Sequence, residues 1–190
     1  SDGQVVTLAG WKGFQLGENG FLTLTAEYKD QDHTERSGYD VRQQYPLVNG
    51  TDFDPREATI NRWNAWTGDP ELEQFTLFAN AGYDMDETTH LYGWASYQDR
   101  DTVSAGFYRR ALDARNVIEI YEDGFLPLSA PETTDVSAGG GVQFAGGGWD
   151  MDASLVYGSN KMDYTIKNTL NRSIGPASDT EFDAGGFKYS

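Results

Sequence analysis

The feature that most constrains this chain is a two-residue repeat of apolar and polar side chains. From Trp149 to Tyr157 every second residue is apolar, and Asp150, Asp152 and Ser154 lie between them. An alternation of this period places apolar side chains on one face of a β-strand. Four further segments keep the repeat, although Phe78, Tyr92 and Trp94 interrupt two of them: residues 22–28, 75–83, 91–97 and 136–144.

The connections between these segments are of two kinds, which alternate along the chain. Short connections fall at LGENG, DMDET and AGGG, and long ones span about residues 33–72 and 102–134. Residues 5–16 alternate poorly, and we place a strand there from context. The pattern predicts an all-β, antiparallel, up-and-down sheet of about three hairpins, or six strands. Short periplasmic turns and long extracellular loops of this kind are typical of a transmembrane β-barrel.

Trp149 and Tyr157 provide a geometric check on this prediction. They lie eight residues apart on one strand face, which at about 3.3 Å per residue and a tilt near 40° is about 20 Å along a membrane normal. That height suits two aromatic girdles at opposite interfaces. The alternative interpretation is that both rings belong to the core of a β-sandwich. No run of about 18 apolar residues occurs, so any membrane crossing has to use strands.

Composition narrows the class of protein. Hydrophobic residues make up 38% and aromatic residues 14% of the chain, with 22 glycines; a barrel wall explains this mixture because only alternate residues need to be apolar. The net charge of −16 argues against nucleic acid or an anionic membrane surface as partner, since both repel an acidic protein. The absence of cysteine excludes disulfides and thiolate metal sites.

Five stretches of the sequence resemble consecutive barrel strands and loops of TonB-dependent outer-membrane receptors: GFLTLTAEYKDQDHTERSGYDVRQQYP, LFANAGYDM, LYGWASYQDRDTVSAGFYRR, ARNV with YEDGFLPL, and GGWDMDASLVYGSNKMDYTIKNTLNRSIGPASDTEFDAGG. The resemblance implies a location in the outer membrane of a Gram-negative bacterium. It also implies import of a scarce small molecule such as an iron-siderophore, cobalamin or an oligosaccharide. The implied partners are outer-membrane lipid, a plug domain inside a barrel of about 22 strands, and an inner-membrane energy-coupling protein.

Within that family we expect residues 1–190 to form only part of the barrel, because no stretch resembles a plug domain and no coupling box lies near Ser1. The chain also does not end in a strand with a terminal aromatic residue. About six strands cannot close so large a barrel, and open sheet edges are costly in lipid. The piece alone is therefore not expected to transport anything.

The candidate ligand-binding residues lie in the second long connection. They concentrate hydrogen-bond donors and positive charge in an otherwise acidic chain: Tyr108, Arg109, Arg110, Arg115 and Asn116. Arginine forks suit carboxylate or phosphate groups, so an anionic ligand is one hypothesis. The alternative is that these arginines pair with loop carboxylates such as Asp101, Asp113 and Glu119 and order the loop.

No catalytic, metal or cofactor site is predicted. Asp30, Asp32, Glu35 and Asp40 lack the spacing of a calcium loop and are interpreted as a solvated strand end. The two histidines, His33 and His90, are far apart in sequence, and no nucleophile or phosphate-binding motif occurs. A soluble all-β carbohydrate-binding module of an exported protein is the second interpretation, and an acidic-residue hydrolase the third. The orientation of the apolar rows discriminates them, because a sandwich buries its rows.

Overall fold

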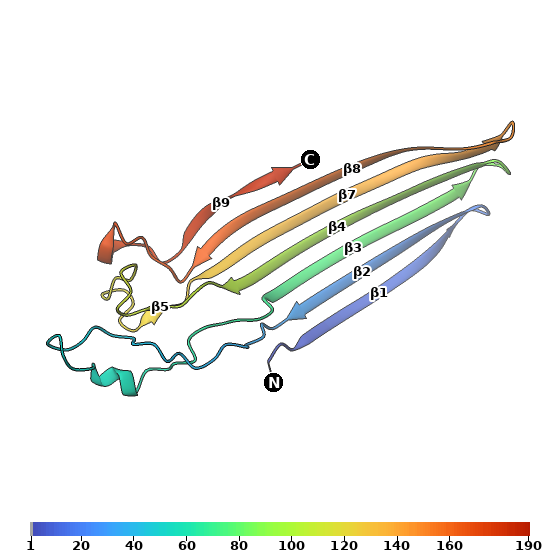
Figure 1. Cartoon of the computed structure of the whole chain (residues 1–190). Helices are drawn as coiled ribbons and strands as arrows, with labels where there is room; N and C mark the ends of the chain where they lie inside the picture. The colour runs from blue at the N-terminus through green and yellow to red at the C-terminus, as the bar shows by residue number, and fades with distance from the viewer. Residues whose placement is uncertain (1) are drawn as a thin grey trace.

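The computed structural model describes residues 2–190, which form one large antiparallel sheet (Figure 1). Seven strands lie side by side in chain order: β1 (Val5–Leu16), β2 (Gly20–Gln31), β3 (Glu71–Asp84), β4 (Thr89–Ala105), β7 (Leu128–Gly146), β8 (Trp149–Lys167) and β9 (Phe182–Tyr189). A separate two-stranded ribbon joins β5 (Arg109–Arg110) to β6 (Gly124–Phe125). Two short 3₁₀ helices complete the structure: η1 (Pro55–Ala58) and η2 (Gly175–Ala177).

The short turns and the long loops lie at opposite ends of the sheet (Figure 1). The first long loop (residues 32–70), the second long loop (106–127) and the third long loop (168–181) all leave from one end. The prediction of an all-β, antiparallel, up-and-down sheet with three tight hairpins is confirmed. Among the described residues the sheet is open, because β1 and β9 are each paired along one side only. In residues 2–190 no helix is long and apolar enough to cross a membrane.

The prediction of six strands is wrong by one. β9 pairs antiparallel with β8 from Asn160 opposite Tyr189 to Ile166 opposite Phe182, with a register shift near Asp163. Consequently the last described strand ends at an aromatic residue, Tyr189, contrary to the expectation from the sequence. Charged residues and two adjacent glycines in FDAGGFKY remove the clear alternation by which the other strands are recognised.

The strands also extend beyond their apolar segments. β7 begins at Leu128 rather than near residue 136, and β8 continues to Lys167 rather than ending at Tyr157. Their ladder runs without interruption from Leu128 opposite Lys167 to Gly146 opposite Trp149. Backbone hydrogen bonds hold the β7–β8 pair together along its whole length. The half of this pair nearer the long loops, which we call its outer half, therefore needs no apolar side chains. The second long loop is correspondingly shorter than predicted.

The register places the predicted apolar rows on one face of the sheet. Directly opposite one another across five strands lie Leu24, Ala79, Ala95, Ala138 and Tyr157. Directly opposed residues point to the same side of a sheet. We call the side that carries these residues the apolar face.

The neighbouring row points to the other side, which we call the polar face. It joins Thr25, Phe78, Ser96, Ser137 and Gly158. Serine hydroxyls of β4 and β7 meet across this row, with 3.0 Å between their Oγ atoms.

Neither face of the sheet is covered by another layer within residues 2–190. On the apolar face Leu155 is 81% exposed, and Leu8 is 67% exposed. A β-sandwich would bury these side chains against a second sheet. Apart from Gly82 of β3, the buried residues lie instead in the long loops and beside them: Gln44, Tyr45, Ala111, Asn116, Val117, Phe125, Ala130 and Thr133.

The glycines of β7 accommodate aromatic rings from β4 on the polar face. A Cβ atom added to Gly139 would lie 2.7 Å from Nε1 of Trp94, which is its direct partner across the ladder. At Gly141 an added Cβ would lie 2.5 Å from the hydroxyl oxygen of Tyr92. The GGG sequence at 139–141 therefore provides space for two rings that lie flat against the sheet.

We predict that Gly139→Ala destabilises the protein by about 1–3 kcal/mol, because the Trp94 ring has to move from its rotamer. Gly158→Ala is the matched control on the same face, since nothing lies within 4 Å of its added Cβ. The control should be neutral or slightly stabilising, because alanine restricts the unfolded chain. Urea midpoints of the purified protein, followed by tryptophan fluorescence, measure both changes. Equal midpoints for the two variants would contradict the packing of Trp94 on Gly139.

Candidate functional site

The first and second long loops pack against each other at the open end of the sheet. Tyr45 of the first loop is 1% exposed, and its hydroxyl donates to Oδ1 of Asp123 at 2.5 Å. The amide of Leu112 donates to the carbonyl of Gln44 at 3.0 Å. Arg110 donates from Nη1 to the carbonyl of Gln43 at 2.7 Å. These contacts join segments about 67 residues apart in sequence. We call the first and second long loops together, residues 32–70 and 106–127, the loop body.

Glu57 organises the turn that presents Tyr45. One carboxylate oxygen accepts hydrogen bonds from the backbone amides of Gln44 and Tyr45 at 2.7 and 2.8 Å. The other pairs with Arg62 at 2.5 Å, and both side chains are largely buried. Burial raises the pKa of Glu57, but these hydrogen bonds together lower it below its usual value. Glu57 is therefore ionised at neutral pH and holds the loop through charge-assisted hydrogen bonds.

Three arginines of the loop body are each held by the aspartate two residues earlier. In the pairs Asp40–Arg42, Asp54–Arg56 and Asp113–Arg115, one carboxylate oxygen accepts from the arginine amide and Nε, and the other from Nη2. We call this arrangement the Asp-x-Arg clamp. In each clamp the arginine lowers the pKa of its aspartate. A guanidinium bound in this bidentate geometry has used its Nε–Nη2 edge, one of the two edges by which it could bind a carboxylate or phosphate.

The five sequence-predicted ligand residues all lie in the second long loop, and three of them have identifiable partners within it. Tyr108 donates from its hydroxyl to the carbonyl of Asp123 at 2.7 Å. Arg115 is clamped by Asp113. Asn116 is buried and donates from Nδ2 to the carbonyl of Tyr121 at 2.9 Å.

The other two predicted residues lie on the β5–β6 ribbon. Arg109 is opposite Phe125 and Arg110 opposite Gly124 in its register. Arg110 reaches the first long loop, as described above. The geometry thus places these five residues near one another, while several of their polar groups serve the folding of the loop.

Two cavities lie between the long loops, and Tyr108 lines both. The first has a volume of about 550 Å³ and is lined also by Asn64, Arg56, Glu122 and other residues. The second, of about 360 Å³, is lined also by Trp66, Arg42 and neighbouring residues. Volumes of this size are usual for small-molecule sites. Asn64 and Trp66 were not predicted from sequence; the amide–tryptophan alternation in NRWNAW is the one signal that could have identified them.

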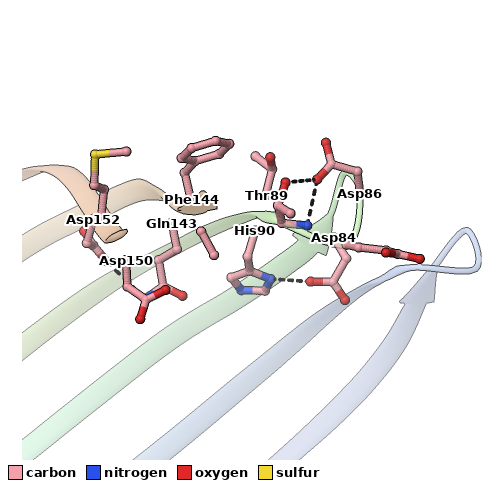
Figure 2. Close-up of a pocket in the computed structure, with 12 residues that line it drawn as sticks. Asp84, Asp86, Thr89, His90, Gln143, Phe144, Asp150 and Asp152 are labelled. Carbon is pink, nitrogen blue, oxygen red and sulfur yellow. Dashed lines mark hydrogen bonds and ion pairs between the residues drawn. The ribbon is translucent and has the colours of Figure 1, made fainter. Parts of the chain in front are cut away.

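A further hollow lies at the turn end of the polar face and measures about 440 Å³. Figure 2 shows His90 and Asp84 side by side in it, with 2.6 Å between Nδ1 and Oδ1. Asp152 accepts from the hydroxyl of Tyr92 at 2.9 Å and from Nε2 of Gln143 at 3.0 Å. These are ordinary polar contacts of a solvated surface. Among residues 2–190 no group of three or more metal-ligating side chains is placed to hold a metal ion.

The apolar face carries its aromatic residues in two lines. The line nearer the loops joins Tyr28, Phe75, Tyr97 and Tyr157, and the line nearer the turns joins Phe14, Tyr83, Phe144 and Trp149. On β3 and on β8 the two lines are eight residues apart. Between the lines Lys12 is the one charged residue of that face among the strands described.

Neither aromatic line follows the hydrogen-bonded rows. The row of directly opposed residues that starts at Tyr28 reaches Lys161 on β8, four strands away. The loop-side line reaches Tyr157 there, so it has shifted by four residues over four strand steps. The turn-side line shifts by six residues over five steps, from Phe14 to Trp149. With about 3.3 Å per residue and about 4.8 Å between strands, both lines slope by about 35–40° relative to the rows.

Beyond the loop-side line the apolar face becomes acidic. Five carboxylates lie directly opposite one another on neighbouring strands: Asp30, Glu73, Asp101, Glu132 and Asp163. Like charges in this position repel, and water reduces their repulsion strongly. This part of the sheet therefore belongs in an aqueous environment, in contrast to the nearly charge-free band between the aromatic lines.

Comparison of the chain with protein-family models, with curated proteins and with solved structures finds no match.

We predict that Glu57→Gln loosens the loop body, because it removes the charge that holds two backbone amides and Arg62. A loss of about 1–2 kcal/mol would raise the open fraction about fivefold to thirtyfold. Trypsin cleavage at the loop arginines, followed on the purified protein, should accelerate accordingly. Glu119→Gln is the matched control, since Glu119 is exposed in the second long loop. Unchanged cleavage in the Glu57 variant would contradict the role assigned to that carboxylate.

Proposed function

We propose that this chain forms part of the wall of a transmembrane β-barrel in the outer membrane of a Gram-negative bacterium. The barrel is proposed to be that of a TonB-dependent receptor, which imports a small-molecule nutrient. The observation that supports the barrel wall most directly is the common slope of the two aromatic lines on the apolar face. The assignment to this receptor family comes from the sequence resemblance.

The slope has a simple physical meaning in a membrane. Membrane interfaces are planes, and strands of a barrel are tilted by about 35–45° from the barrel axis. A girdle that follows the plane of the interface therefore meets each successive strand at a different row of directly opposed residues. The angle between the girdle and these rows equals the strand tilt. Two lines that slope by about 35–40°, about eight residues apart, describe two girdles separated by about 20 Å. Core aromatics of a soluble sandwich have no reason to keep such parallel lines.

The open edges of the sheet fit the same proposal. β1 and β9 each leave a row of backbone groups unpaired among the described residues, and such groups cost several kcal/mol each in hydrocarbon. We propose that further strands of a larger barrel, of about 22 in all, pair with both edges. The polar face then lines the interior, where a plug domain and water contact it. The loop body faces outward, and an inner-membrane energy-coupling protein drives import.

The soluble carbohydrate-binding module is the competing proposal, and the loop cavities favour it as much as they favour a receptor. A soluble module would leave the nearly charge-free band between the two aromatic lines of the apolar face exposed to water. Monomeric soluble proteins rarely expose apolar patches larger than a few hundred Å². The band spans six strands, from Phe14 on β1 to Trp149 on β8, so the membrane proposal accounts for more of the surface.

Fractionation of native cells tests the proposed function directly. An antibody to the second long loop is used to compare heated and unheated samples of the outer-membrane and soluble fractions. We expect an outer-membrane band several times heavier than 21.1 kDa, whose mobility changes on heating as that of closed barrels does. A soluble band at 21.1 kDa with no such change would refute the receptor proposal and favour the carbohydrate-binding module.

A charge introduced on either face gives a second, residue-level prediction. Ala79→Arg places a guanidinium midway between the aromatic lines, and we expect a loss of about 2–4 kcal/mol in lipid. Asn80→Arg, one residue further, places the same charge on the polar face and should cost little. Urea unfolding of the protein in lipid vesicles measures the difference. Equal costs for the two variants would argue against a lipid-facing surface.

A further inference from the structure

We propose that the two cavities beside Tyr108 form one binding site for a neutral, hydroxyl-rich ligand such as a short saccharide. This inference deepens the proposed function, on which it rests, by giving the chemical class of the imported molecule. In the proposed receptor the loop body faces the medium, so a ligand meets this site before it meets the barrel interior. The binding groups are contributed by the first long loop at Asn64 and Trp66, and by the second at Tyr108.

The first step of the argument is the arrangement of the two cavities. Tyr108 lines both of them, and Asn64 lines one while Trp66 lines the other. Asn64 and Trp66 are separated in the chain by Ala65 alone, which also lines the second cavity. An extended ligand that passes the Tyr108 ring can therefore contact both side chains, and aromatic rings are favourable partners for the apolar faces of such ligands.

The second step is the state of two buried donors. Nδ2 of Asn64 and Nε1 of Trp66 are both shielded from solvent, and among residues 2–190 neither has a hydrogen-bond partner. Buried donors are usually satisfied, and each exception calls for an explanation. Both belong to residues that line the cavities, so on this proposal a small shift of the two side chains lets acceptor atoms of a ligand satisfy them. Such a ligand offers hydrogen-bond acceptors at two separated positions.

The third step is electrostatic and disfavours an anionic ligand. The two arginines that line the cavities, Arg42 and Arg56, are both held in Asp-x-Arg clamps. Arg56 also donates from Nη1 to Glu122 at 2.9 Å. In both guanidinium groups an aspartate therefore occupies the Nε–Nη2 edge and partly neutralises the charge, which weakens the attraction of each arginine for a carboxylate or phosphate. Arg109, Arg110 and Arg115, the arginines of the sequence-based hypothesis, line neither cavity, so an anionic ligand held by them is not favoured here.

The remaining polar groups complete the requirement. Glu122 and Asp123 line the first cavity with largely exposed carboxylates, which accept hydrogen bonds. Burial, then the charge of Asp123, raises the pKa of Tyr108, so its hydroxyl stays neutral. A ligand has to donate to carboxylates and accept from N–H groups in one small volume. A hydroxyl group does both, and vicinal hydroxyls do so at neighbouring positions.

Binding to immobilised glycans tests the proposal. Purified full-length protein in detergent is applied to an array that carries neutral, uronate-containing and sialylated oligosaccharides. We expect retention on neutral glycans, reduced at least tenfold in Asn64→Asp and at least threefold in Trp66→Phe, which keeps an aromatic ring but removes the N–H donor. Trp63→Phe is the matched control, since Trp63 lies in the same loop, is exposed and lines neither cavity. Each variant must keep the electrophoretic mobility of the unheated wild type, which verifies folding.

Three results would overturn the inference: retention on acidic glycans alone, no retention on any neutral glycan, or retention that neither Asn64→Asp nor Trp66→Phe reduces relative to Trp63→Phe. Its failure is distinguishable from failure of the proposed function. An outer-membrane band that changes mobility on heating, with no binding to neutral glycans, would remove the ligand class and leave the barrel. A soluble band with glycan binding that depends on Asn64 would remove the receptor and leave the site.

Discussion

The backbone ladder is the constraint on which every other feature of the structure depends. From β1 to β8 the strands pair without a slip in register. A shift by one residue at any pair would move all following side chains to the opposite face. The apolar face, both aromatic lines and the carboxylate row exist because no such one-residue shift occurs across the six strands. The single register shift lies between β8 and β9, beyond the last of these features.

The sequence predicts the sheet as far as side-chain alternation marks it. β2, β3 and the inner half of β8 were identified because apolar and polar residues alternate there, and the tight turns fixed the hairpins. β9 and the outer half of β7 were missed because polar strands lack this contrast and are held by backbone hydrogen bonds alone. β1 contains Gly10, Lys12 and Gly13 within its alternation, and its register is established by its partner β2 rather than by its own sequence.

The candidate site was less predictable, because its geometry depends on contacts between distant loops. The sequence indicated a cluster of arginines, but it did not show that Arg110 is engaged by the carbonyl of Gln43. One part of the site could be predicted from local sequence: the Asp-x-Arg spacing recurs three times, and it identifies arginines that are already paired with an aspartate. Asn64 and Trp66 attract attention only when burial and partners are known, since neither residue type is unusual in a loop.

The distribution of buried residues connects the proposed membrane location with the proposed site. The sheet has almost no core of its own, so on the barrel proposal its stability comes from lipid on one face and from the interior on the other. The loops contact neither lipid nor the barrel interior on this proposal. They contain a core of their own, which includes Tyr45, Phe125 and the Glu57–Arg62 pair. A loop body that is ordered before a ligand arrives loses little conformational entropy on binding. Two cavities between loops that are already ordered are therefore better suited to capture a dilute ligand than disordered loops would be.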